Sequence, residues 1–205
     1  MIETVKFIAI GYLSGSILFA RVCAKLMNKP AILQESRDGN PGTVNAFKYG
    51  GFMCGIITLI GDLAKGFLPV FVFWRYGGVL KEFVPAAALV LVSPVLGHAF
   101  PAFSNFQGGK GIAVTFGCLL GTYPELIPVM VFALLFIFFS MVLRITPHFT
   151  RTIVTYIATL FIFICLRCPP GILLGFGLIS ATVMLRFHMS REAREKQEVK
   201  LLWMR

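Results

Sequence analysis

The chain has 205 residues, of which 57% are hydrophobic and only 14% are charged, against roughly 25% charged residues in a typical soluble domain. This composition excludes a soluble globular fold and predicts an all-α integral membrane protein, because lipid can solvate apolar surface that water cannot. The net charge of +10 would suggest nucleic-acid binding in a soluble protein. Here no basic module stands apart from the apolar stretches, so nucleic acid is not an expected partner.

Seven apolar segments are expected to form transmembrane helices within one domain that covers residues 1–205. In chain order they are 4–26, 50–75, 84–103, 111–122, 124–144, 150–167 and 171–187. The fourth is short for a bilayer core of about 30 Å and is predicted to be a half-helix entered through glycines. The charged tail, 187–205, is predicted to be a basic amphipathic helix on the cytoplasmic surface.

The lysines and arginines predict the orientation of these helices. With the N-terminus outside, 14 of the 19 basic residues lie on the inner side, four lie on the outer side, and Lys65 lies within a span. Cytoplasmic loops carry the excess of Lys and Arg in membrane proteins. The N-terminus is therefore expected outside, the C-terminus in the cytoplasm, and the number of spans is expected to be odd.

The first inner loop, residues 34–51, is rich in glycine and in polar side chains that can bind an anion. Asn40, Asn45 and Lys48 alternate with four glycines, and Asn-Pro-Gly at 40–42 is a turn signal. Asparagine amides and glycine N–H groups offer hydrogen-bond donors without bulk, which suits a phosphate. A plain turn between two spans is the alternative.

The segment 97–111, GHAFPAFSNFQGGKG, places Lys110 among Gly108, Gly109 and Gly111 directly before a predicted helix. Backbone N–H groups, a helix N-terminus and one ammonium together predict an anion site. It is not a Walker A loop, because that motif needs Ser or Thr after the lysine. His98, at the start of this segment, is the strongest catalytic candidate among the three histidines.

A pair of charges stands inside the second span. Asp62 and Lys65 are three residues apart, so they share a helix face and are expected to form an ion pair, since either charge alone would be costly in lipid. A purely structural pair and a pair that supports the site are both open at this point. Cys165 and Cys168 form a single C-x-x-C without two further ligands nearby, so no metal site is predicted.

The chain offers anion-binding groups without a nucleophile elbow, an H-x-x-x-x-D pattern or an aspartate cluster. This combination favours a transfer between two phosphorylated substrates that the protein holds together.

Four stretches make the chain resemble the bacterial membrane acyl-phosphate:glycerol-3-phosphate acyltransferases. They are GYLSGSILFARVCAKL, DGNPGTVNAFKYGG, GDLAKGFLPV and GHAFPAFSNFQGGKGIA. The likeness covers nearly the whole chain, and the last stretch is the most specific. It implies transfer of an acyl group from acyl phosphate to the primary hydroxyl of glycerol 3-phosphate, giving lysophosphatidic acid and phosphate, with no cofactor. It also implies a monomer in the bacterial inner membrane whose active site faces the cytoplasm.

The resemblance assigns roles to individual positions. The implied catalytic residues are Lys110, His98 and His188. The implied substrate- and phosphate-binding residues are Asn40, Asn45, Lys48, Gly108, Gly109, Gly111, Thr150 and Asp38.

The chain departs from the family pattern around this site. Asp38 stands where a serine is usual, Lys48 where an arginine is usual, and Thr150 where a serine is usual. In the tail, Phe187 replaces arginine and Arg191 replaces asparagine. Two alternatives therefore stay open: a divergent paralog that acylates another phosphorylated acceptor, and a non-catalytic transporter or head-group binder.

Overall fold

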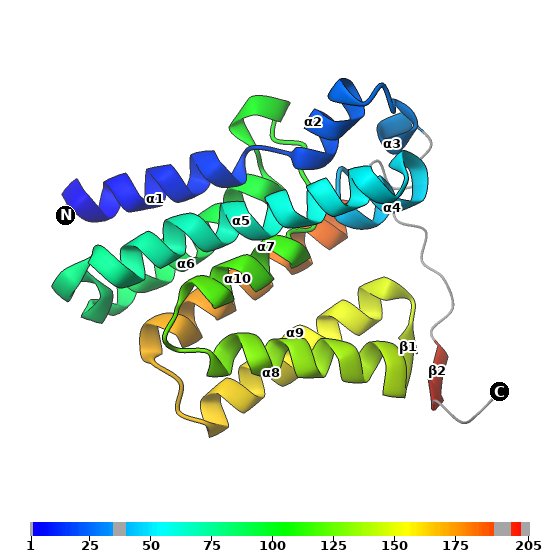
Figure 1. Cartoon of the computed structure of the whole chain (residues 1–205). Helices are drawn as coiled ribbons and strands as arrows, with labels where there is room; N and C mark the ends of the chain where they lie inside the picture. The colour runs from blue at the N-terminus through cyan, green and yellow to red at the C-terminus, as the bar shows by residue number, and fades with distance from the viewer. Residues whose placement is uncertain (1, 35–39, 191–197, 202–205) are drawn as a thin grey trace.

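The computed structural model describes residues 2–34, 40–190 and 198–201, and this part of the chain is mostly helical (Figure 1). The helices are α1 (Ile2–Gly15), α2 (Phe19–Leu26), α3 (Ala31–Gln34), α4 (Thr43–Gly50), α5 (Phe52–Tyr76), α6 (Val84–Ala99), α7 (Ile112–Gly121), α8 (Ile127–Ile137), α9 (His148–Cys165) and α10 (Pro170–Met189). Short turns of other helix types are η1 (Gly78–Glu82), η2 (Ala102–Ser104) and η3 (Phe138–Val142). The two strands are β1 (Leu143–Thr146) and β2 (Glu198–Leu201).

Five helical stretches in the described residues are long and apolar enough to cross a membrane. They are 2–26, 52–76, 84–104, 148–165 and 170–189. The two other apolar helices, Ile112–Gly121 and Ile127–Val142, are shorter. The expected helical fold with apolar spans is thus confirmed. The fourth segment is short, as expected, because ten residues of helix rise only about 15 Å. The expected count of seven full spans stays a prediction.

The outward faces of these helices are apolar. Leu134 of α8 is 64% exposed, Ile164 of α9 60% and Leu68 of α5 55%. Apolar surface of this extent would be unfavourable in water and is solvated by lipid in a bilayer.

Small residues let α5 and α7 pack closely. A Cβ atom added to Gly66 of α5 would overlap the carbonyl oxygen of Val114, and one added to Gly117 of α7 would overlap that of Leu63. Close backbone approach through glycine is the usual way in which helices associate in membranes. This close packing brings Asp62 of α5 beside the start of α7. The residues directly before α7, 107–111, are called the glycine loop below.

An aromatic cluster joins α8, α9 and α10 to this pair. The ring of Tyr156 stacks on Phe176 at 5.4 Å and meets Phe132 edge-on at 5.0 Å. The Tyr156 hydroxyl donates a hydrogen bond of 3.0 Å to Thr115 Oγ1 of α7. This contact sets the face of α9 that is turned toward α5 and α7.

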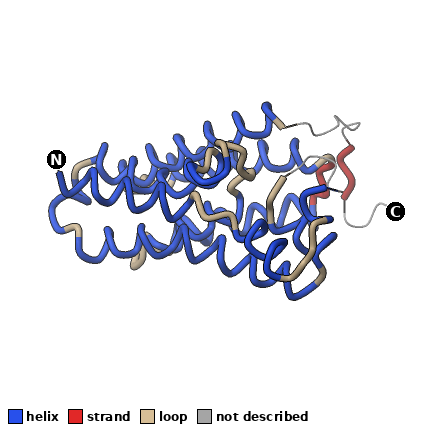
Figure 2. Tube along the Cα trace, turned by 90° about the horizontal axis from the view of Figure 1, so that it is seen from above, coloured by secondary structure: helices blue, strands red, loops and turns tan. Residues whose placement is uncertain are grey.

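The α4 helix and both strands lie at the end of the molecule opposite the first turn of α1 (Figure 1). Figure 2 shows the two strands at the same end. β1 and β2 pair antiparallel, with Leu143 opposite Leu201. The predicted tail helix is therefore wrong for residues 198–201, whose backbone groups complete a two-stranded ladder with β1. The stretch 191–197 and the end of the tail, 202–205, lie outside the described residues.

Candidate active site

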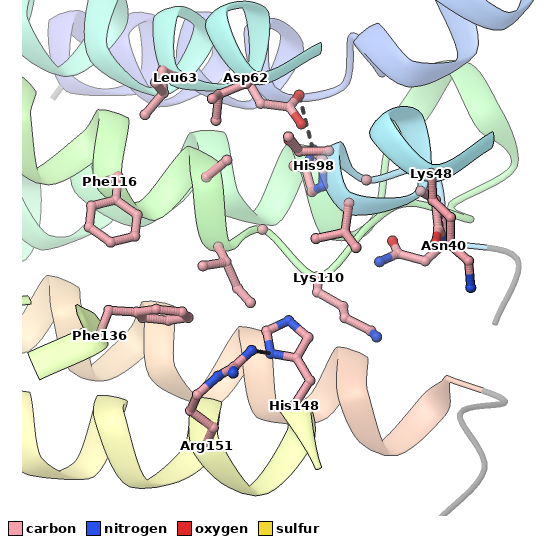
Figure 3. Close-up of a pocket in the computed structure, with 18 of the residues that line it drawn as sticks. Asn40, Lys48, Asp62, Leu63, His98, Lys110, Phe116, Phe136, His148 and Arg151 are labelled. Carbon is pink, nitrogen blue, oxygen red and sulfur yellow. Dashed lines mark hydrogen bonds and ion pairs between the residues drawn. The ribbon is translucent and has the colours of Figure 1, made fainter. Parts of the chain in front are cut away.

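A cavity of about 890 Å³ opens among α4, α5, the glycine loop, α7, α8 and the start of α9 (Figure 3). Polar groups gather on part of its lining and apolar groups on the rest. The polar lining consists of Asn40, Thr43, Asn45, Lys48, Asp62, His98, Lys110, His148 and Arg151. The apolar lining includes Leu59, Leu63, Ile112, Ala113, Phe116, Leu120, Val129 and Phe136.

The glycine loop is held in place through its backbone carbonyl groups. Arg186 of α10 donates two hydrogen bonds to the Gly108 carbonyl oxygen, from Nε at 3.2 Å and from Nη2 at 2.7 Å. From the other side, Arg21 of α2 donates from Nη2 to the Gln107 carbonyl oxygen at 3.1 Å. The Gly109 N–H donates to the His98 carbonyl oxygen at 3.0 Å. Two helices distant in sequence therefore fix the loop that carries Lys110.

Glycine is required at these positions for space and for backbone conformation. A Cβ atom on Gly108 would overlap the His98 carbonyl oxygen, and one on Gly109 would overlap His98 Nε2. Gly111 has φ +81° where it precedes α7, a left-handed conformation that costs a side-chain-bearing residue free energy. The three glycines thus let the loop pass against His98 and turn directly into α7.

Lys110 extends from this loop into the cavity, between His98 on one side and His148 on the other (Figure 3). Its side chain is largely buried, and its Nζ lies 4.6 Å from the ring centroid of Phe187. Cation–π contact of this kind holds an ammonium at a defined place without neutralising its charge.

A buried network stands behind His98. Lys65 Nζ lies 2.8 Å from Asp62 Oδ1, 2.7 Å from the Ile17 carbonyl oxygen and 2.8 Å from His98 Nδ1. An ammonium can only donate hydrogen bonds, so Lys65 donates to the Ile17 carbonyl oxygen and to His98 Nδ1, and its contact with Asp62 is an ion pair. Nδ1 of His98 must then accept, which places the proton of the neutral ring on Nε2, the atom next to Gly109 and Lys110. The predicted ion pair therefore exists, and it orients a ring that lines the cavity.

The first inner loop meets the glycine loop at the polar end of the cavity. Asn45 Nδ2 donates a hydrogen bond of 2.8 Å to the Asn40 carbonyl oxygen, which ties α4 to the residues before it. A Cβ atom on Gly109 would lie 3.1 Å from Asn40 Oδ1, so the two loops are in contact. Lys48, one turn further along α4, lines the same end. The structure thus brings together the two polar segments that the sequence singled out.

The apolar end lies deeper among α5, α7 and α8. Phe116 of α7 packs edge-on against Phe136 of α8 at 5.9 Å, and both rings stand on the opposite side of the close-up from Asn40 and Lys48 (Figure 3). Leu120, one turn beyond Phe116, is 42% exposed, so this end reaches the lipid-facing surface. The cavity can therefore take a molecule with one anionic end and one long apolar end.

Among the predicted site residues that the structure describes, His188, Thr150, Gly108 and Gly109 are not among those that line the cavity. His188 is exposed at the end of α10, because Phe187 turns inward and consecutive helical residues point about 100° apart. Thr150 is half-buried on α9 but lies off the face that carries residues 148 and 151. Asp38 lies outside the described residues, as does Arg191.

Two lining residues, His148 and Arg151, were not predicted as site residues. They come from the first turn of α9 and share a face at i, i+3 spacing. That spacing of two basic residues at the start of an apolar helix was the available signal. Within the described ranges, no group of three His, Cys, Asp or Glu side chains is close enough to hold a metal ion.

Comparison with known proteins gives one consistent result. The family model described as "Glycerol-3-phosphate acyltransferase" matches residues 5–195. The glycerol-3-phosphate acyltransferase of Laribacter hongkongensis is 30% identical over 187 residues, which cover 90% of this chain and 89% of the relative.

Two solved structures share the fold. One is a crystal structure of PlsY (YgiH), an integral membrane glycerol 3-phosphate acyltransferase, in its glycerol 3-phosphate form, with a TM-score of 0.75, 26% identity and coverage of 91% of this chain and 88% of that chain. The lysophosphatidic acid form of PlsY aligns with a TM-score of 0.70, 26% identity and coverage of 90% and 87%.

Proposed function

The chain belongs to the glycerol-3-phosphate acyltransferase family, and we propose that the cavity described above is where it transfers an acyl group from acyl phosphate to the primary hydroxyl of glycerol 3-phosphate. The products are lysophosphatidic acid and inorganic phosphate. The enzyme acts in the membrane, where its acyl donor and its product both reside.

The observation that carries this assignment is the two-ended lining of one cavity. Lys48 and Lys110 stand near amide groups at one end, and paired phenylalanines stand at the other. A phosphorylated polar acceptor fits the first end, and the acyl chain of the donor fits the second. The reacting carbonyl group then lies between them, beside Lys110 and His98 (Figure 3).

The chemistry requires positioning and charge stabilisation more than a covalent intermediate. The acceptor's hydroxyl oxygen attacks the acyl carbonyl carbon, a new ester bond forms, and the bond between that carbon and the phosphate oxygen breaks. The leaving phosphate takes up the hydroxyl proton, so no protein base is consumed. The Lys110 ammonium and the Nε2–H of His98 donate toward the carbonyl oxygen, where negative charge develops in the transition state.

The test is release of phosphate by purified protein in detergent. With acyl phosphate and glycerol 3-phosphate present, we expect phosphate release coupled to formation of lysophosphatidic acid, and neither product when the acceptor is omitted. Release no greater than that of Lys110→Ala would overturn the assignment. Release only with another phosphorylated acceptor would show that the acceptor differs from that of the family.

We further propose that the chain crosses the bacterial inner membrane seven times with its N-terminus outside, so that the cavity opens to the cytoplasm. The distribution of Lys and Arg supports this orientation. A green fluorescent protein fused to the C-terminus should fluoresce, and alkaline phosphatase fused there should be inactive. The reverse pattern would place the cavity on the outer side and would contradict the proposal.

A further inference from the structure

The start of α9 forms a second basic wall of the cavity, across from the glycine loop. His148 and Arg151 both line the cavity, and the close-up shows them facing Lys110 from the other side (Figure 3). Neither residue belongs to the polar segments that carry the site at the other wall. The cavity therefore has positive charge on two opposed walls.

A hydrogen bond joins the two side chains of this wall. Arg151 Nη2 lies 2.9 Å from His148 Nδ1, and because a guanidinium can only donate, Nδ1 accepts and the neutral ring carries its proton on Nε2. The Thr152 hydroxyl donates to the His148 carbonyl oxygen at 2.8 Å, and its oxygen lies 3.5 Å from His148 Nδ1.

Arg151 Nε is buried without a hydrogen-bond partner among the described residues. Because Nε is buried, the terminal Nη groups of Arg151 are the donors that can reach an anion in the cavity that this residue lines. A guanidinium also matches the oxygens of a phosphoryl group with two parallel N–H groups, which an ammonium cannot do.

The position of Arg151 along the cavity distinguishes the two substrates. Helix geometry places it about 4.5 Å deeper along α9 than His148, on the side where Phe116 and Phe136 form the apolar end (Figure 3). Asn40 and Lys48 stand at the opposite end. Acyl phosphate carries its phosphate directly on the carbonyl group at the head of its chain, whereas glycerol 3-phosphate has no apolar part.

We propose that Arg151, oriented by His148, binds the phosphate of the acyl donor and retains it as the leaving group, while Asn40, Asn45 and Lys48 bind the phosphate of the acceptor. This inference rests on the proposed function. Arg151 and Lys48 provide separate positive charges for the two phosphates, so two anions can occupy one cavity without strong mutual repulsion. Lys110 lies between the two and serves the reacting carbonyl group.

The experiment measures both Michaelis constants in Arg151→Gln, with purified protein in detergent. Loss of a charge-assisted hydrogen bond to phosphate is expected to raise the KM for acyl phosphate by roughly tenfold to a hundredfold, and the KM for glycerol 3-phosphate should stay within twofold. Competitive inhibition by inorganic phosphate against acyl phosphate should weaken by a similar factor. Arg151→Lys should recover part of both effects, because it restores the charge without the paired N–H groups.

Arg75→Gln is the matched control, since Arg75 is an exposed arginine in the last turn of α5, outside the cavity lining. It should leave both constants unchanged. An increase in KM for glycerol 3-phosphate alone, an equal increase for both substrates or no change in either would overturn the assignment of Arg151. The ratio of the two constants does not depend on how much protein is folded, and a wild-type enzyme without phosphate release would instead contradict the proposed function.

Discussion

The cavity is bounded by two walls that carry their positive charge in different ways. On one side, Asp62 of α5 and His98 of α6 line the cavity and form what is called here the neutral wall. Lys65 is buried behind them, where it pairs with the Asp62 carboxylate and donates to the Ile17 carbonyl oxygen and to His98 Nδ1. On the α9 wall, Arg151 lines the cavity and its Nη2 donates to His148 Nδ1, and no carboxylate of the described residues forms a salt bridge with it. A cation neutralised within the protein can orient its neighbours, and one left with open donors can bind a ligand.

The largest expected effect is on stability, and it comes from removing the carboxylate that pairs with Lys65. Asp62→Asn would leave the Lys65 ammonium in the protein interior without its carboxylate, and the free energy of unfolding should fall by about 3–5 kcal/mol. Denaturant unfolding in detergent, followed by circular dichroism, measures this change. Wild-type stability in Asp62→Asn would show that the neutral wall does not depend on the ion pair.

The double variant Asp62→Leu, Lys65→Met separates stability from orientation. Apolar residues of similar size should restore much of the lost stability, yet activity should stay low because His98 Nδ1 loses its donor and the ring proton is no longer confined to Nε2. A double variant with full activity would limit Asp62 and Lys65 to a structural role.

Lys110 lies between the two walls, and Lys110→Ala tests its contribution to the reaction. We expect kcat to fall by about 10²–10³-fold, the usual loss when one donor to a developing oxyanion is removed. The loop should keep its place because Arg21 and Arg186 hold it through carbonyl groups of other residues. Steady-state phosphate release measures the loss, and an active Lys110→Ala enzyme would remove the lysine from the mechanism.

Arg186→Gln tests whether the loop must be clamped. It weakens the two hydrogen bonds to the Gly108 carbonyl oxygen, and a displaced Lys110 should lower kcat by about tenfold, which corresponds to about 1.4 kcal/mol. Arg186→Lys, which can restore one bond, should lie between wild type and Arg186→Gln. If both variants match the wild type in kcat, the clamp has no influence on the reaction.

The smallest effects are expected outside both walls. His188→Ala and Thr150→Ala should change kcat and stability by less than about 0.5 kcal/mol, or roughly twofold, because neither side chain lines the cavity. The same assays measure both. A tenfold loss of activity in His188→Ala would contradict this expectation and would support the catalytic role predicted for His188 from the sequence.

The helical segments could be predicted from apolar runs alone, and the differences have local causes. The predicted span 50–75 matches α5 at Phe52–Tyr76. The predicted span 4–26 is interrupted between Gly15 and Phe19, where the chain must free the Ile17 carbonyl oxygen to accept from Lys65. No hydropathy pattern contains that long-range contact.

The sequence singled out lining residues of the candidate site in polar loops, and it did not single out His148 and Arg151, which lie in a helix. Lys110 and Asn40 interrupt apolar sequence with glycine-rich segments, and this contrast marks them. Arg151 begins a long apolar helix and is indistinguishable, by sequence, from a basic residue that flanks a span. The role predicted for His188 stays a prediction, and in the structure the inward residue of that helical turn is Phe187.

Amino-acid composition and four motifs by themselves determined that this protein is a helical membrane acyltransferase with a lysine held among glycines, since apolar periodicity and turn chemistry are local properties of the chain. The tertiary structure alone decided which charges face one another. Glycine contacts draw α5 against α7, and the Tyr156–Thr115 hydrogen bond turns α9 so that Arg151 faces the cavity. Rotation of a helix about its axis depends on the helices packed against it, and so the second wall could be seen only in three dimensions.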